Sequence, residues 1–140
     1  MKPTVHRKLV RPAVLAVAFF LALPSVTALA TDLDDILYGI AMVETRNRDV
    51  GLHDDGVSYG RYGITNQAVR ELQRVGHLEQ GRYNLIDPDT NRQIAILYLR
   101  HLKDRYGSWW KATEMYNPRG QNYARKVWAA IDRRRMNREA

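Results

Sequence analysis

Leu33-Asp34-Asp35-Ile36-Leu37-Tyr38-Gly39-Ile40-Ala41-Met42-Val43-Glu44-Thr45 is an amphipathic stretch that carries a carboxylate on its apolar side. At about 100° per residue in a helix, Leu33, Leu37 and Ile40 share one stripe, and Glu44 falls on it too. Apolar surroundings disfavour the ionised form of a carboxyl group and raise its pKa, which suits a general acid near neutral pH. The pattern indicates a catalytic acid at Glu44. The alternative is that the stripe ends in the last helical turn, where Glu44 simply reaches water.

Residues 1–30 are typical of a secretory signal peptide, so we expect the mature chain to begin at Thr31. Basic residues precede an apolar segment from Ala13 to Leu23, and Ala28-Leu29-Ala30 has the small-x-small pattern of a cleavage site. An uncleaved anchor is the alternative, but the 11 continuous apolar residues are fewer than the ~20 that a spanning helix needs. We therefore predict an exported protein of the periplasm or cell envelope, with no stable membrane span after cleavage.

Charge is concentrated at the end of the chain. From residue 31 on there are 18 Lys and Arg residues against 15 Asp and Glu, but residues 31–124 contain only 12 against 13. Residues 132–140 are therefore predicted to be a basic C-terminal tail, best interpreted as a solvated terminus. The near-neutral body, the lack of a recognition motif and the export signal argue against nucleic-acid binding. Cysteine is absent, so the core must hold the fold together without disulfides.

Hydrophobic periodicity predicts an all-α fold, because no segment shows the alternation of a strand of any length. Thr31 is expected to cap the first helix, with Asp32, Asp34 and Asp35 as acidic residues of the helix start rather than a metal site. Glycines and aspartates from residue 46 to 62 indicate a loop or a small irregular hairpin. Helices are expected at 31–44, 66–75, 91–106, 108–116 and from about 123 on, with 91–106 the longest and apolar nearly all round at its centre.

Five short motifs follow one another along these predicted elements. They are Glu44-Thr45, Ser58 to Ile64, Asp87-Pro88-Asp89-Thr90-Asn91 with Tyr98-Leu99, Ala112 to Tyr116-Asn117 with Gly120, and Tyr123 with Val127. In this order the chain resembles the catalytic domain of soluble lytic transglycosylases, family 23 of the glycoside hydrolases, which is related to goose-type lysozyme. The resemblance extends from about Leu33 to Trp128. It implies a small lysozyme-like domain, which we place at residues 31–131, and no cofactor.

The family that the chain resembles cleaves the β-1,4 bond between N-acetylmuramic acid and N-acetylglucosamine with one glutamate. As an acid the glutamate protonates the bond, and as a base it then takes the proton from the muramoyl C6 hydroxyl, which closes a 1,6-anhydro ring without water. The resemblance assigns both steps to Glu44 and makes peptidoglycan glycan strands the substrate. Small domains of this type also suit local wall opening for a secretion, conjugation or motility apparatus.

The resemblance also implies supporting roles for residues around Glu44. Tyr116 is expected to position Glu44 through its hydroxyl, with a half-buried core tyrosine as the alternative, and Asn117 to brace the turn of its own motif. Thr45 is expected to support catalysis by keeping the hydroxyl of the family's usual serine. The substrate-binding residues are expected to be Tyr59, Gly60, Tyr62, Gly63, Ile64 and Asn117.

Two further departures from the family pattern lie along the expected cleft. Gly63 stands where the family usually has a glutamine, so an amide that lines the cleft is missing. Asn117-Pro118-Arg119-Gly120 is one residue longer than the usual Asn-x-Gly, which is expected to reshape one rim. We expect no departure, including Thr45, to touch the acid itself.

The loop after Glu44 leaves other interpretations open. Asp54 or Asp55, facing Glu44 across a cleft, would permit the two-carboxylate hydrolysis of a lysozyme, although solvated turn aspartates fit the loop better. His53 beside them suggests a metal site, but three consecutive residues do not easily converge on one ion, so no metal is predicted. A non-enzymatic alternative is a catalytically impaired peptidoglycan-binding domain of an envelope apparatus, because Gly63 has replaced the amide.

Overall fold

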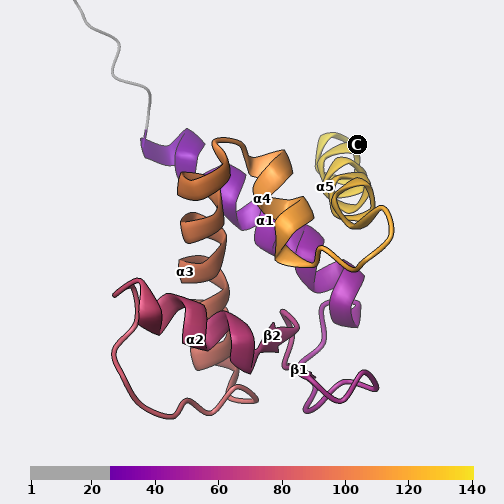
Figure 1. Ribbon diagram of the computed structural model, residues 1–140. Helices are drawn as coiled ribbons and strands as arrows, with labels where there is room; N and C mark the ends of the chain where they lie inside the picture. Colours follow the sequence, from indigo (N-terminus) through magenta and orange to yellow (C-terminus); the bar gives the residue numbers. More distant parts are fainter. Residues whose placement is uncertain (1–25) are drawn as a thin grey trace, which may run out of the picture.

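Helix α1 runs obliquely through the centre of the molecule and packs against α5 and α3, while α2 and α4 pack against α3 (Figure 1). The computed structural model describes residues 26–140, so most of the predicted signal peptide lies outside the described part of the chain. The predicted all-α fold is confirmed, with one short hairpin as its only strand pair among these residues. The elements are α1 (Val26–Thr45), β1 (Ser58–Tyr59), β2 (Ile64–Thr65), α2 (Asn66–Arg74), α3 (Pro88–Tyr106), α4 (Trp109–Tyr116) and α5 (Tyr123–Glu139).

The start of α1 differs from the prediction. The helix begins at Val26, so Thr31 lies inside it and does not cap it in this chain. The helix-start interpretation of the aspartates is also wrong, because the first turn of α1 contains no acidic residue. Asp34 pairs instead with Arg92 of α3 at 3.1 Å. Asp35 is 3% exposed and pairs with arginines of α5. These carboxylates therefore join α1 to other helices.

Helices α1 and α5 form the most extensive helix contact of the fold. Leu37 and Ile40 of α1 and Val127 and Ile131 of α5 are all buried, as their shared faces in the sequence predict. Gly39 lets the two backbones approach, since a Cβ at this position would lie 2.8 Å from the Val127 carbonyl oxygen. This close packing fixes the end of α1 relative to the start of α5.

Helix α3 begins earlier than predicted but ends where expected. The Asp87 carboxylate accepts a hydrogen bond from the Thr90 amide at 2.8 Å, Pro88 opens the helix, and Gly107 ends it in a left-handed conformation with φ 80°. With 19 residues it is one shorter than α1, so the prediction that it is the longest helix is wrong. Its apolar run is not buried all round, because Tyr98 is only partly buried.

The basic C-terminal segment is not a separate solvated tail. Helix α5 continues without a break to Glu139. Arg134, Arg135 and Arg138 pair with Asp35 at 3.4, 3.1 and 3.6 Å, respectively. The sequence could not reveal these pairs, because about 100 residues separate the partners. Within residues 26–140 no helix is long and apolar enough to cross a membrane.

Candidate active site

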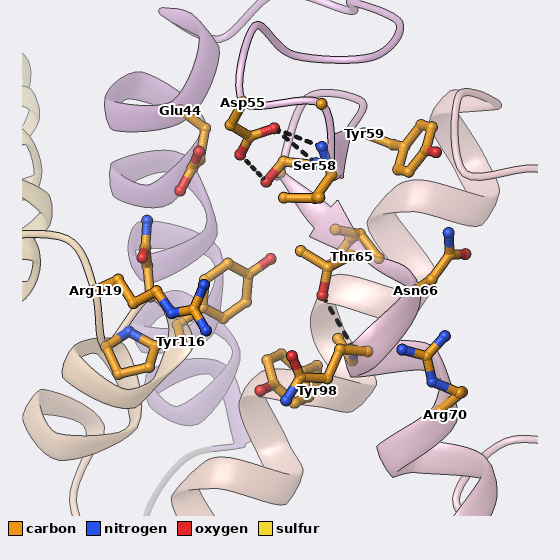
Figure 2. Close-up of a pocket in the computed structure, with 18 residues that line it drawn as sticks. Glu44, Asp55, Ser58, Tyr59, Thr65, Asn66, Arg70, Tyr98, Tyr116 and Arg119 are labelled. Atoms are coloured by element: carbon orange, nitrogen blue, oxygen red, sulfur yellow. Dashed lines mark hydrogen bonds between the residues drawn. The ribbon is translucent and has the colours of Figure 1, made fainter.

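Glu44 lies in the last turn of α1, at one wall of a cleft of about 880 Å³ (Figure 2). The facing wall consists of the β1–β2 hairpin and the first turns of α2, while α3 and the end of α4 close the cleft between them. The side chain of Glu44 is only 13% exposed, so it does not simply reach water. The residues that line the cleft include Glu44, Asp55, Ser58, Tyr59, Gly63, Ile64, Thr65, Asn66, Arg70, Tyr98, Tyr116, Asn117 and Arg119.

The surroundings of Glu44 favour its protonated form. Burial raises the pKa of Glu44 above its ordinary value, and this effect exceeds the lowering by the Tyr123 hydrogen bond and by the charge of His53. The pKa direction expected from the helical stripe is therefore found. The hydroxyl of Tyr123 donates to Glu44 Oε1 at 2.6 Å, so one oxygen is already held while the other faces His53.

Tyr123, rather than Tyr116, makes the direct hydrogen bond to Glu44 among the described residues. The hydroxyl of Tyr116 donates instead to the main-chain carbonyl of Tyr62 at 2.8 Å. The two rings are stacked, with centroids 6.4 Å apart and planes 9° apart, so Tyr116 supports the ring of Tyr123. Burial and the charge of Glu44 raise the pKa of both tyrosines well above the ordinary value, which keeps both hydroxyls as donors.

The sequence identified Tyr123 only as part of a motif with Val127 and gave it no role beside Glu44. Its ring is buried with Val127 and Ile131, as the periodicity of α5 predicts. Its hydroxyl points at Glu44 because the start of α5 packs against the end of α1. Helical spacing identifies the buried face but cannot tell what the end of a buried side chain meets.

His53 is a second neighbour of Glu44 that the sequence analysis considered only as a metal ligand. Its Nε2 lies 2.7 Å from the carbonyl oxygen of Gly60, and because a carbonyl only accepts, Nε2 carries the hydrogen. The other ring nitrogen, Nδ1, then faces Glu44 Oε2 at 3.9 Å. The ring is thus held edge-on to the acid. No group of three candidate ligands that could hold a metal occurs among residues 26–140.

Asp55 is a turn aspartate that also lines the cleft. One of its oxygens accepts from the backbone amides of Val57 and Ser58 at 2.9 Å each, and the other accepts from the Ser58 hydroxyl at 2.5 Å. The Ser58 hydroxyl, followed by the Val57 amide, lowers the pKa of Asp55 below its ordinary value. Asp55 therefore stays ionised, and both of its oxygens accept hydrogen bonds within its own turn. Asp54 is exposed and does not line the cleft.

The hairpin that faces Glu44 is anchored by Asn91, which is fully buried at the start of α3. Its side-chain oxygen accepts from the Tyr62 amide at 3.0 Å, and its nitrogen donates to the carbonyls of Tyr59 and Leu85 at 2.9 and 2.8 Å. Gly60 leaves room for this amide, since a Cβ there would lie 2.4 Å from Asn91 Nδ2. Gly60 and Tyr62 thus shape the hairpin and do not line the cleft, contrary to the expectation of substrate contact.

Gly63 lies directly against the acid, so the expectation that no departure touches it is wrong. Its φ is +60°, and a Cβ at this position would be 2.7 Å from Glu44 Oε2. The glycine therefore does more than remove an amide, because it leaves the space that the carboxylate of Glu44 occupies. Tyr59, Ile64 and Asn117, also predicted to bind substrate, do line the cleft.

Thr45 and Asn117 support the site through backbone groups. The Thr45 hydroxyl lies 3.1 Å from the carbonyls of both Ala41 and Arg61 and accepts from the Arg48 amide at 3.2 Å, which ties the end of α1 to the hairpin. The side-chain oxygen of Asn117 accepts from the Gly120 amide at 3.1 Å and closes the predicted turn. A side-chain hydrogen bond from Asn117 also lowers the pKa of Glu44.

Comparison with known proteins agrees with this arrangement. The family model described as the transglycosylase SLT domain matches residues 31–136, which includes every residue of the cleft. No curated protein and no solved structure matched the chain. The matched segment covers most of the chain, from α1 into α5. With its helical fold and its buried glutamate at a cleft, the chain therefore belongs to the lysozyme-like transglycosylase SLT family, whose members act on peptidoglycan as lytic transglycosylases.

Proposed function

We propose that the protein is a lytic transglycosylase that cleaves peptidoglycan between N-acetylmuramic acid and N-acetylglucosamine, with Glu44 as its catalytic acid and base. The observation that carries this proposal is a single carboxyl group with a raised pKa, hydrogen-bonded to Tyr123 at the wall of a long cleft. Asp55, the other acidic residue that lines the cleft, is occupied by three hydrogen bonds in its own turn.

In the first step Glu44, in its protonated form, gives its proton to the oxygen that links the two sugars. The bond between this oxygen and the muramoyl C1 breaks, and positive charge develops at C1 as in other glycosidases. Glu44 becomes a carboxylate at this point. The Tyr123 hydroxyl at 2.6 Å and the amide of Asn117 stabilise the new charge, because hydrogen bonds to the ionised form favour it.

In the second step the Glu44 carboxylate takes the proton from the muramoyl C6 hydroxyl while O6 bonds to C1. The proton returns to Glu44, a 1,6-anhydro ring closes, and no water is consumed. This path requires one carboxyl group that can both give and take a proton, and a buried glutamate with a bound phenol has that property. Tyr116 assists by holding the ring of Tyr123 and the hairpin carbonyl of Tyr62.

A lysozyme-type hydrolysis of the same bond is the second candidate, and the position of Asp55 favours it. Asp55 lines the cleft, and its charge raises the pKa of Glu44. It would have to leave the Ser58 hydroxyl to act on a water or on the sugar.

We place the protein in the periplasm or cell envelope on the basis of residues 1–30, with local action at an envelope apparatus as a further expectation.

Mass spectrometry of digested sacculi tests the proposal. The expected products are anhydromuropeptides, which are lighter by one water than their reducing counterparts, and Glu44→Gln should release none. Reducing ends alone would select the hydrolase. Binding to sacculi without either product would select a non-catalytic domain, in which Gly63 has removed a necessary amide.

A further inference from the structure

Two arginines line the cleft, and the fold does not use their charges. Arg119 lies in the connection between α4 and α5, and Arg70 lies on α2. Figure 2 shows their guanidinium groups on opposite sides of the cleft. Neither forms an ion pair with a described carboxylate, and both side chains are exposed. By contrast, Arg61 between strands β1 and β2 forms an ion pair with Asp49 at 2.7 Å.

The cleft therefore offers positive charge to a ligand. Besides the two arginines, its charged lining consists of Glu44 and Asp55. Glu44 is held in the wall of the cleft by the Tyr123 hydroxyl, and both oxygens of Asp55 are engaged by Ser58 and Val57. What remains free to bind is cationic, and a guanidinium is well suited to a carboxylate because it can donate two parallel hydrogen bonds.

The Asn117–Gly120 turn, which carries the extra residue, places Arg119 at the cleft that Glu44 also lines. The turn is closed by the Gly120 amide, which donates to the main-chain oxygen of Asn117 at 3.0 Å and to its side-chain oxygen at 3.1 Å. Pro118 and Arg119 occupy the middle of the turn and both line the cleft. Because Asn117 and Arg119 line the same cleft as Glu44, the turn presents Arg119 to the muramic acid residue that Glu44 would act on in the proposed reaction.

That sugar carries the acidic groups of the polymer. N-acetylmuramic acid bears a lactyl ether whose carboxylate is free in a strand without peptides and is amide-linked in a strand with stem peptides. In the second case the stem supplies carboxylates of its own. A polymer of N-acetylglucosamine alone has the same backbone linkage and no acid.

We propose that Arg119, together with Arg70 on the facing wall, binds carboxylates carried by muramic acid residues, so that the cleft selects anionic glycan strands over uncharged N-acetylglucosamine polymers. This inference rests on the proposed function, and it concerns how the same cleft recognises its substrate. The shared chemistry is a carboxylate on muramic acid, with the lactyl group and the stem peptide as its two sources.

Binding in a Glu44→Gln background tests the proposal, because the substitution removes turnover and leaves the arginines in place. Three ligands are titrated: glycan fragments that carry stem peptides, the same strands after amidase removal of the peptides, and an uncharged N-acetylglucosamine hexamer. The variants are Arg119→Gln and Arg70→Gln. Arg100→Gln is the matched control, because Arg100 is exposed on α3 and does not line the cleft.

We expect Arg119→Gln and Arg70→Gln each to weaken binding of the acidic strands by about three- to tenfold at low salt, with a smaller effect at high salt because exposed charges are screened. Binding of the uncharged hexamer and all binding by Arg100→Gln should be unchanged. A loss confined to peptide-bearing strands assigns the stem carboxylates, and a loss confined to peptide-free strands assigns the lactyl carboxylate. A loss on both acidic strands shows that the arginines bind carboxylates from either source.

Two results would overturn the inference while the proposed function stands. Unchanged affinities in both arginine variants would show that the charges are not used, and equal losses on all three ligands would show that the arginines only shape the cleft. In both cases the protein with Glu44 intact would still release anhydromuropeptides. Absence of that product, with no binding of any strand, would instead remove the proposed function and the inference with it.

Discussion

Helix α1 holds two buried carboxylates against α5, and their surroundings differ. Asp35 is 3% exposed and faces the guanidinium groups of Arg134, Arg135 and Arg138. Glu44, nine residues later at the other end of the contact, is 13% exposed and meets the hydroxyl of Tyr123. The same pair of helices thus supplies fixed cations to one carboxylate and a neutral phenol to the other.

The difference separates a structural carboxylate, Asp35, from Glu44, the carboxylate that we propose to be catalytic. Neighbouring cations compensate for the removal of an ionised group from water, so the Asp35 cluster joins the two helices. The Tyr123 phenol offsets only part of the cost of burying an ionised carboxylate, so burial still raises the pKa of Glu44. The Glu44 carboxyl group can therefore exchange a proton. Removing the Asp35 carboxylate should therefore affect the stability of the fold, and removing the Glu44 carboxylate should affect the rate of cleavage.

The largest effect is expected from Glu44→Gln, which should lower cleavage of sacculi by orders of magnitude because no other carboxylate is free to replace it. Its stability at neutral pH should be unchanged or higher. A carboxylate whose folded pKa is raised destabilises the fold once pH exceeds its unfolded pKa, and this effect grows until pH passes the folded value. A turbidity assay and a thermal melt at neutral pH measure the two quantities. A much lower melting temperature would identify Glu44 as a structural ion-pair partner.

Asp35→Asn should have the opposite effects: it should lower stability and leave cleavage unchanged. It leaves three arginines facing an amide, and we expect a loss of about 2 kcal/mol in the free energy of unfolding. This is below the ~3–5 kcal/mol of a fully buried pair, because Arg134, Arg135 and Arg138 are 27, 45 and 53% exposed and can turn to water. Urea unfolding measures the loss. Well below the melting temperature, the cleavage rate per folded molecule should equal that of the unsubstituted protein. A loss of activity at such temperatures would show that the Asp35 cluster also supports the site around Glu44.

Tyr123→Phe should reduce the cleavage rate by about ten- to a hundredfold, the equivalent of one buried hydrogen bond to a charged group. The hydroxyl lowers the pKa of Glu44, so its removal should also move the alkaline limb of the rate profile to higher pH. Tyr116→Phe is the matched control, since its hydroxyl bonds to the Tyr62 carbonyl instead. We expect the control to lower stability more than rate. A larger rate loss in Tyr116→Phe than in Tyr123→Phe would reverse the two roles.

The smallest effect is expected from His53→Gln, and it should be visible only in the pH dependence. The charge of His53 lowers the pKa of Glu44, so without it the acid keeps its proton to higher pH. The alkaline limb of kcat/KM should therefore move upward, with little change in the maximal rate, and pH–rate profiles of both proteins measure the shift. Identical profiles would mean that His53 only holds Gly60 through its 2.7 Å contact.

The sequence predicts the helices well because their signals are local. Asp87-Pro88 and Gly107 delimit α3, and Ser108 caps α4 as expected. Glu44 could be predicted for the same reason, since its place on the stripe of Leu37 and Ile40 depends on one helix alone. The start of α1 was missed because Thr31, a residue type that often caps helices, follows the expected cleavage site, whereas the helix begins at Val26 inside the predicted signal peptide.

The partners of the two carboxylates could not be predicted, because they depend on how α5 packs against α1. Asp35 meets arginines about 100 residues away, and Glu44 meets Tyr123 across 79 residues. Gly63 illustrates the same limit at closer range. The sequence shows that an amide is absent, and only the fold shows that the carboxylate of Glu44 fills the vacated space.

The bond between Glu44 and Tyr123 also sets an order for the assembly of the proposed site. A chain that has emerged only as far as α4 contains Glu44, the hairpin and most of the cleft, but it lacks the hydroxyl donor and the α5 surface that position the carboxyl group. On the proposed function, the ability to cleave glycan strands therefore appears only after α5 has packed against α1.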